Sequence, residues 1–465
     1  MKTVVRYLPM TAIVVMAMCC FAFFQFWYPY HFFYQEQNQL FLWSWDYIST
    51  YFNKPGYIAR LAGDFLTQFY YYLYAGATIL AVCQLLIGLL FYRALANFRL
   101  PKTGALVISL LAMGFVAVSH FHTSYRLSST ISIIGWILLL WLISLIRGWK
   151  MRTILMMLVL LPAYLLFGLP QFKKIQSPDF ILEKSFAVSN EYYFGNHDKV
   201  TEMVEHADVV TDQMLFFYNL VQAQRGELPD HLLSFTPNYL GTFEKIGPES
   251  HRLTIINMNE LYWALGDMTF TERAAMMTNV FSPDNRNVRM MKRLAECNIV
   301  SRDSAAAEKY LRILDKTLAY RHWSKTARSN PLYAQKAAFV NHHDTITISD
   351  NAHFLMMQLL DANPDNTIAL DYILCSTLLL KDIENFKRDY DRYCIDTNRP
   401  RRKTLYQEAL CIWLAGTNAP QEEWQKYILD AKVFERFRQY NQQRGSEAFK
   451  DTYWYYFDKA KAPQI

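Results

Sequence analysis

Five long runs without Asp, Glu, Lys or Arg fill the first third of this sequence. Each run has 18 or more residues, and 18 helical residues rise about 27 Å, close to the ~30 Å hydrocarbon core of a bilayer. A charge at the centre of such a helix costs about 2.5–3.5 kcal/mol on insertion scales. Buried helices of soluble domains usually keep a polar face, whereas these runs are apolar all round. The sequence therefore predicts five membrane-spanning helices, at residues 8–28, 69–92, 103–120, 128–146 and 153–170.

The rest of the chain has a different composition. Charged residues are frequent there, apolar residues are spaced rather than continuous, and the period-two alternation typical of strands is missing. The averages over the whole chain, 52% hydrophobic residues and a mean hydropathy of -0.01, mix these two unlike parts. We therefore predict an all-α fold, with a transmembrane domain over residues 1–174 and a helical domain over residues 175–465.

The short loops between the predicted spans differ in charge. Eight Lys and Arg residues precede the first run or join the second run to the third and the fourth to the fifth, whereas the opposite loops hold three. Loops rich in Lys and Arg stay in the cytoplasm. We therefore predict a cytoplasmic N-terminus and, with five spans, an extracytoplasmic C-terminal domain. No small-residue cleavage pattern follows the first run, so we interpret it as a retained anchor.

The first extracytoplasmic loop, residues 29–68, is rich in aromatic residues. We predict two short interfacial helices here, the first within residues 30–47 and the second over residues 58–66, separated by a Pro-Gly turn. Aromatic rings with polar tips favour the membrane–water boundary, so this loop is interpreted as an aromatic belt packed on the spans. The alternative is that Glu36, Asp46 and Asp64 line a site at the membrane surface.

Two segments of the C-terminal domain match at an offset of 81 residues. Pro283-Asp284-Asn285 aligns with Pro364-Asp365-Asn366, and each is followed by apolar positions on one helix face and by a second helix. Turns are expected at Gly195, Gly226 and Gly266, whose spacings of 31 and 40 residues bracket the 34 residues of a tetratricopeptide repeat. We therefore predict stacked helical pairs of tetratricopeptide type, which leave a concave surface.

Other features of this domain carry less information. Residues 321–349 interrupt the helical rhythm and are predicted to form an irregular insertion. Cys394 and Cys411 can pair in an oxidising compartment, although buried free thiols are the favoured interpretation. His342-His343-Asp344 with His353, like the pair His120 and His122 at the end of the third run, lacks the spacing of a zinc site. We expect no metal and no cofactor.

Several function classes are disfavoured. The net charge of +6 lies largely in short loops beside the apolar runs, and no basic stretch with interleaved aromatic residues occurs. We therefore expect no nucleic-acid partner. Phosphate-binding loops and the common hydrolase motifs are missing. The apolar runs also lack the acidic or basic residues that ion-coupled transporters usually place at mid-membrane.

Four segments carry a resemblance to a known family. Residues 36–42, Pro55-Gly56, residues 63–70 and residues 363–366 look like those of an uncharacterised family of multispan membrane proteins of Bacteroidota-type bacteria. The resemblance implies a multi-pass protein of a bacterial inner membrane with a tetratricopeptide-like tail, and it assigns no chemistry.

Two functions follow as hypotheses. The helical repeats and the lack of catalytic motifs favour a membrane-anchored scaffold that binds a protein or peptide in the periplasm. The alternative is a polytopic glycosyltransferase that uses a lipid-linked sugar donor. Glu36 or Asp46 is then the general base, and Arg60 or Arg126 holds the phosphate. If the chain is a scaffold, no residue is catalytic.

Overall fold

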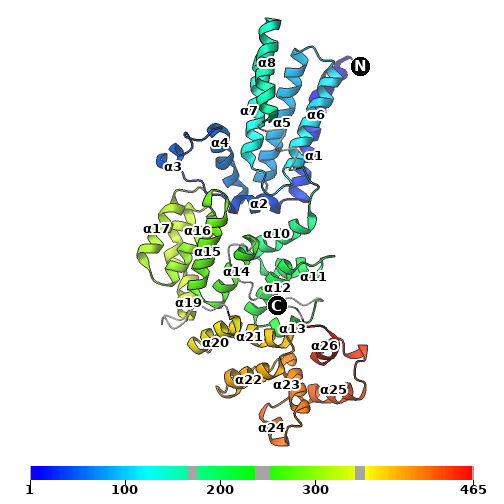
Figure 1. Cartoon of the computed structure of the whole chain (residues 1–465), viewed down its shortest axis with the longest axis vertical. Helices are drawn as coiled ribbons and strands as arrows, with labels where there is room; N and C mark the ends of the chain where they lie inside the picture. The colour runs from blue at the N-terminus through cyan, green and yellow to red at the C-terminus, as the bar shows by residue number, and fades with distance from the viewer. Residues whose placement is uncertain (1, 166–174, 236–251, 341–350, 463–465) are drawn as a thin grey trace. The chain divides into compact units, whose positions relative to one another are not determined.

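The computed structural model describes residues 2–165, 175–235, 252–340 and 351–462. Within these ranges every regular element is a helix, so the predicted all-α fold class is confirmed (Figure 1). The chain divides into two compact units. The membrane unit comprises Met1–Asn190, Asn279–Lys292 and Glu308–Ala327, and the C-terminal unit comprises Glu191–Thr278, Arg293–Ala307 and Arg328–Ile465.

An antiparallel bundle forms the first part of the membrane unit. Among the described residues, four helices are long and apolar enough to cross a membrane. Central α5 packs against the other three, and a Cβ at Gly88 would lie 2.6 Å from Met113 Sδ and 2.7 Å from Ile13 Cγ2. Glycine at this position therefore lets the helices approach closely. The four helices are α1 (Lys2–Phe26), α5 (Ala75–Asn97), α6 (Lys102–Ser119) and α7 (Leu127–Ser144).

The fifth predicted span begins with α8 (Trp149–Ala163), and its residues 166–170 lie outside the described ranges. The start of α8 lies where α5 ends, because Arg152 Nη1 donates to the Asn97 carbonyl (3.5 Å). After the gap, the chain lies beside the other end of the bundle. Gln176 Nε2 donates to the carbonyl of Phe121, just past α6 (2.8 Å).

The aromatic loop folds into short helices. The Pro-Gly turn is confirmed, since Gly56 has φ +69° and directly precedes the last helix of the loop. The first interfacial helix, predicted within residues 30–47, is replaced by two short helices on either side of an extended stretch. The span predicted from residue 69 starts later, because a 3-10 turn, η1, comes first and Tyr74 has φ +70°. The elements are α2 (Tyr30–Gln37), α3 (Trp45–Ser49), α4 (Tyr57–Thr67) and η1 (Gln68–Tyr71).

Segments distant in sequence complete the membrane unit. The N–H of Val288 donates to the Gln39 carbonyl (3.1 Å), and the N–H of Trp43 donates to the Lys316 carbonyl (2.7 Å). The aromatic loop is therefore joined through its backbone to residues 249 and 273 positions later. The later elements are η3 (Pro283–Asn285), the start of α16 (Val288–Val300), the end of α17 (Ser304–Asp315) and α18 (Arg321–Thr326).

Helices packed in succession form the C-terminal unit: α11 lies on α12, and α20 to α23 follow one another. The turns predicted at Gly195, Gly226 and Gly266 are confirmed, with φ of +79°, +72° and +82°. Its helices include α11 (His197–Glu205), α12 (Asp212–Arg225), α14 (Arg252–Leu265), α15 (Met268–Phe281), α19 (Pro331–Phe339), α20 (Ala352–Ala362), α21 (Thr367–Leu379), α22 (Ile383–Tyr390), α23 (Thr404–Gly416), α24 (Gln421–Lys426), α25 (Ala431–Gln442) and α26 (Tyr453–Lys459).

Two further expectations are settled by the C-terminal half. The irregular insertion predicted over residues 321–349 is wrong for 321–339, where α18, a 3-10 turn and α19 form; residues 341–349 lie outside the described ranges. Proline suits the first position of α19, because that N–H would have no helical partner. Cys394 and Cys411 are free and buried, as the favoured interpretation had it.

Candidate functional site

Glu36 lies in a buried polar centre of the membrane unit. Its side chain is 1% exposed and that of Arg289, at the start of α16, is 4% exposed. Arg289 Nε donates to Glu36 Oε2 (3.2 Å), and the Tyr320 hydroxyl donates to Glu36 Oε1 (2.9 Å). Arg289 Nη2 also donates to Asn190 Oδ1 (2.9 Å). Both carboxylate oxygens of Glu36 are therefore occupied by protein donors.

The electrostatics of this centre balance burial against pairing. Burial raises the pKa of Glu36, while the charge of Arg289 and the hydrogen bond from Tyr320 offset part of that rise. A general base needs a lone pair that faces the substrate, and here both oxygens face the protein. The arrangement is that of an ion pair which ties α2 to α16. The catalytic role predicted for Glu36 stays a prediction that this geometry does not favour.

Asp46 does not join this centre. It lies in the first turn of α3 and is exposed, whereas the Glu36 oxygens bond Arg289 and Tyr320. Arg60, one of the two predicted phosphate ligands, is also exposed. The structure therefore leaves the two predicted catalytic carboxylates in different surroundings.

Asp64 lies in a second cluster. The Tyr51 hydroxyl donates to Asp64 Oδ2 (2.7 Å) and lies 2.9 Å from the Tyr47 hydroxyl, which accepts from Arg286 Nη1 (2.5 Å). The Arg286 guanidinium also lies 4.7 Å from the centre of the Tyr47 ring. Burial raises the pKa of Asp64, and the hydrogen bond from Tyr51 opposes the rise. These contacts join α3 and α4 to the segment after η3.

Arg126, the other predicted phosphate ligand, is paired at the edge of the same region. Its Nη1 donates to Asp284 Oδ2 (2.7 Å), and both side chains are roughly half exposed. Partial burial of Asp284 raises its pKa, but the bond and charge of Arg126 outweigh this, so the pKa lies below its usual value. The pair links the start of α7 to η3.

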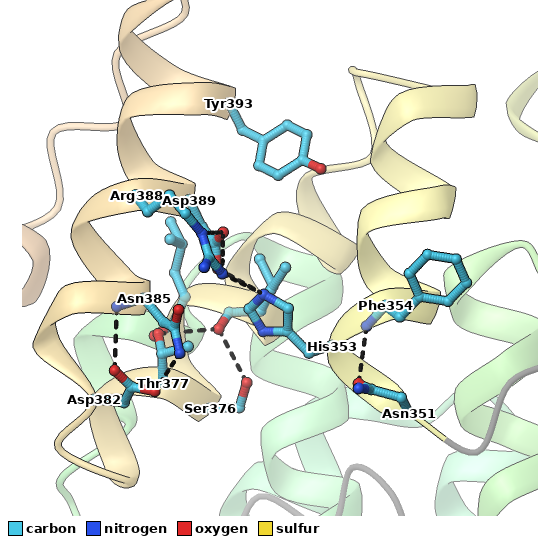
Figure 2. Close-up of polar contacts among 12 residues, drawn as sticks. Asn351, His353, Phe354, Ser376, Thr377, Asp382, Asn385, Arg388, Asp389 and Tyr393 are labelled. Carbon is cyan, nitrogen blue, oxygen red and sulfur yellow. Dashed lines mark hydrogen bonds and ion pairs between the residues drawn. The ribbon is translucent and has the colours of Figure 1, made fainter.

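A third polar cluster lies in the C-terminal unit, between α20 and α22 (Figure 2). His353 Nε2 lies 3.0 Å from Oδ2 of buried Asp389, and Arg388 Nη2 lies 3.4 Å from the same ring nitrogen. A hydrolytic dyad would need a nucleophile at the histidine, but Ser376 donates its hydroxyl proton to the Ile373 carbonyl. The cluster therefore ties two helices together. His342, His343 and Asp344 lie outside the described residues.

Two hollows lie on the last helices of the C-terminal unit. One, of about 490 Å³, is bounded by residues of α22, α23, α25 and α26. The other is an open apolar groove of about 700 Å³ along α24 and α25, hereafter the α24–α25 groove. Sequence reasoning missed both hollows. The available signal was the apolar residues Trp424, Ile428 and Phe434, which occur close together in an otherwise polar stretch.

Comparison with known proteins bears on the family alone. The model described as "Family of unknown function (DUF6057)" matches residues 5–173 and 169–460. Neither the curated proteins nor the solved structures contain a match to the chain. The resemblance to an uncharacterised family is therefore confirmed, whereas the bacterial group stays a prediction. Because the two matches together cover almost the whole sequence, the chain belongs to the family of unknown function DUF6057.

Proposed function

We propose that this chain crosses the inner membrane of a bacterium five times and holds its C-terminal unit in the periplasm, where the α24–α25 groove binds a protein partner. Successive helices α20 to α23 are the part that we propose to be tetratricopeptide-like. The proposal has a topological part and a recognition part, and each part has its own support and its own test.

Contacts at the two ends of the bundle support a fifth crossing. Arg152, at the start of α8, bonds to the last residue of α5. Gln176 bonds beside the end of α6, which runs antiparallel to α5. These two contacts put residues 152 and 176 at opposite ends of the bundle, which supports a crossing between them. A 25-residue segment is long enough for this, since a span needs about 20 residues.

Contacts between the loops of the bundle and residues 284–289 support the same crossing independently. Arg126, which precedes α7, is paired with Asp284. Glu36, which follows α1, is paired with Arg289. Both loops lie at one end of the bundle, and α7 leads away from it, which supports a return crossing before residue 284. Basic residues concentrated in the other loops favour a cytoplasmic location for that opposite end.

Two single-cysteine positions test this topology. Glu422→Cys places an exposed thiol on α24, and Lys150→Cys places one at the start of α8. In intact cells, a membrane-impermeant maleimide should label the first position, and the second only after lysis. The native cysteines of the C-terminal unit are buried, and the chain without added cysteines serves as the background control. Labelling of Glu422→Cys only after lysis would contradict the fifth crossing.

A strained, exposed residue supports the recognition part. Ile428 has φ +47° and is 60% exposed at the α24–α25 groove. A β-branched residue in the left-handed region is a genuine outlier, and such residues concentrate at binding sites. Phe434 is 41% exposed, and its ring lies 5.5 Å from that of Trp424. The groove therefore presents an apolar surface that the protein's own packing does not cover.

Surrounding charges favour a protein as the occupant. Exposed residues of both signs accompany the groove on α24 and α25, among them Glu422, Lys432 and Glu435. A polar rim around an apolar centre is the ordinary anatomy of a protein–protein interface. An anionic membrane surface would instead attract a cluster of basic residues. We infer that the occupant is an apolar helix face of another protein.

Photocrosslinking in intact cells tests the groove. A benzophenone amino acid at position 428 should give a discrete adduct, and Phe434→Asp in the same chain should abolish it. Leu332, which is 63% exposed on α19, provides the matched control because it is equally apolar but lies outside the groove. Equal adducts from positions 428 and 332, or none from position 428, would contradict the proposal.

The glycosyltransferase alternative makes a different prediction. If Glu36 or Asp46 is a general base, Glu36→Gln and Asp46→Asn should each lower transfer of sugar from a lipid-linked donor in membranes that contain the protein. The groove variant Phe434→Asp should leave such transfer unchanged. Unaltered transfer in both acid variants would refute the enzymatic alternative.

A further inference from the structure

The hollow of about 490 Å³ on the last helices, hereafter the aromatic pocket, has no part in the proposed function. We propose that it is a binding site for a neutral saccharide. Its volume lies within the range of small-ligand sites, about 300–1,000 Å³. The inference is independent of the α24–α25 groove, and its lining shares no residue with that groove.

The floor of the aromatic pocket is rigid and aromatic. Phe437, Tyr440 and Trp454 line it and are at most 6% exposed. The ring centres of Phe437 and Trp454 lie 5.2 Å apart, and those of Tyr440 and Trp454 lie 5.8 Å apart. Such a packed floor keeps its shape without a ligand, which lowers the entropic cost of binding.

Trp413 provides a fixed aromatic surface in the lining. Its indole N–H donates to Glu384 Oε2 (3.1 Å), and the Lys387 ammonium lies 4.5 Å from the ring centre. Trp413 is partly exposed, so part of its side chain stays accessible beside Lys387. The weakly positive C–H groups on one face of a sugar ring suit the negative face of an indole.

Polar groups in the lining offer both donors and acceptors. Arg444 donates through Nε and Nη2 to Asp458 (2.7 and 2.8 Å), so its charge is balanced while Nη1 takes no part in that pair. Glu384 adds acceptor oxygens, and the exposed Asn441 adds an amide that both donates and accepts. Sugar hydroxyl groups need this mixture, because each one both donates and accepts.

Charged ligands fit less well. An anion would have to compete with Asp458 for Arg444, and that pair is bidentate. A cation would rely on Glu384, whose carboxylate already accepts a hydrogen bond from Trp413. Lys387 lies one turn away on the same side of α22, and its positive charge would repel a cation. A neutral polyol with an apolar ring face can bind without displacing Asp458 from Arg444 and without relying on the charge of Glu384.

A glycan array tests this inference on the full-length protein in detergent. We expect binding to neutral oligosaccharides. Trp413→Ala and, separately, Asn441→Ala should weaken it about tenfold, the effect of losing about 1.4 kcal/mol of contact energy. Gln442→Ala, the next residue of α25 and not part of the lining, is the matched control and should bind normally. Phe434→Asp should also bind normally, which separates this site from the groove.

Asn441→Ala tests the site even if the tryptophan variant misfolds, because Asn441 is exposed at the end of α25 and its replacement should leave the fold intact. Thermal melting of each variant confirms that it is folded. Three results would overturn the inference: no binding to any glycan on the array, binding to acidic glycans or to phosphocholine alone, or binding that both variants leave unchanged.

Discussion

The buried pair of Glu36 and Arg289 gives the sharpest test of how the aromatic loop is held. Arg289→Met leaves a carboxylate that is 1% exposed with Tyr320 as its remaining donor. Removing one partner of a buried pair costs about 3–5 kcal/mol. Glu36→Gln should cost less, because Asn190 and the Phe33 carbonyl still accept from Arg289.

Hydrogen exchange by mass spectrometry measures this cost locally, which matters because a chain of two units does not unfold in one step. Exchange across α2 and residues 38–43 should rise roughly a hundred- to a few-thousandfold in Arg289→Met, at 1.4 kcal/mol per tenfold. The effect should grow with pH, because burial already raises the pKa of Glu36 and loss of the arginine raises it further, so the folded state favours a protonated carboxyl. The double variant should cost about 1–3 kcal/mol less than the sum. Less than a tenfold rise, or strict additivity, would refute the reasoning.

Three further perturbations probe separate features. Burial raises the pKa of Glu183 from 4.5 to about 8, so its contribution to the free energy of unfolding should be complete below about pH 4.5 and be lost as pH rises through 8. The loss should be about 5 kcal/mol at most. Glu183→Gln should flatten this decline in melting curves recorded across pH. Gly63→Ala would place a Cβ 2.6 Å from the Ser128 backbone and should destabilise the protein by about 1–3 kcal/mol, whereas Gly104→Ala, with open space around it, should be neutral in the same thermal assay. Ile428→Gly relieves a left-handed backbone and should stabilise the protein by about 1 kcal/mol while weakening partner binding; a lower melting temperature would count against strain at this position.

Features that depend on local composition were predictable from the sequence. A run of 18 residues without charge is long and apolar enough to span a bilayer as a helix, so the sequence predicts α1, α5, α6 and α7. Their exact ends were less certain, because the tyrosines before α5 suit an interface as well as a span. Tyr74 in the left-handed region is a tertiary detail that hydropathy does not encode.

Pairings across long sequence separations were not predictable. Nothing beside Glu36 signals that Arg289, 253 residues later, is its partner. The same holds for Arg286 and Tyr47, 239 residues apart. The sequence alone therefore offers Glu36 for a site at the membrane surface, since an acidic residue without a known partner is ordinarily solvated.

Hollows on a helical surface also escape a reading by periodicity. Trp413 and Trp454 both occur in helices, and either suits a helical core. Only the packed structure leaves Trp454 buried and Trp413 partly exposed. The helix α19 inside the segment predicted to be irregular depends on a local detail: Asn330 accepts from the Leu332 N–H and starts the helix at Pro331.

The contacts of the aromatic loop with Arg289 and Tyr320 have a consequence for biosynthesis. Tyr320 follows Glu36 by 284 residues, so at ~5–20 residues per second it is synthesised roughly 15–60 seconds later. Throughout that interval the first loop lacks the donors that its carboxylate needs. A nascent chain of this kind would expose an aromatic loop to chaperones and proteases until the tail arrives. Synthesis of the segment that holds Arg289 and Tyr320, rather than membrane insertion, is then the event that completes the membrane unit.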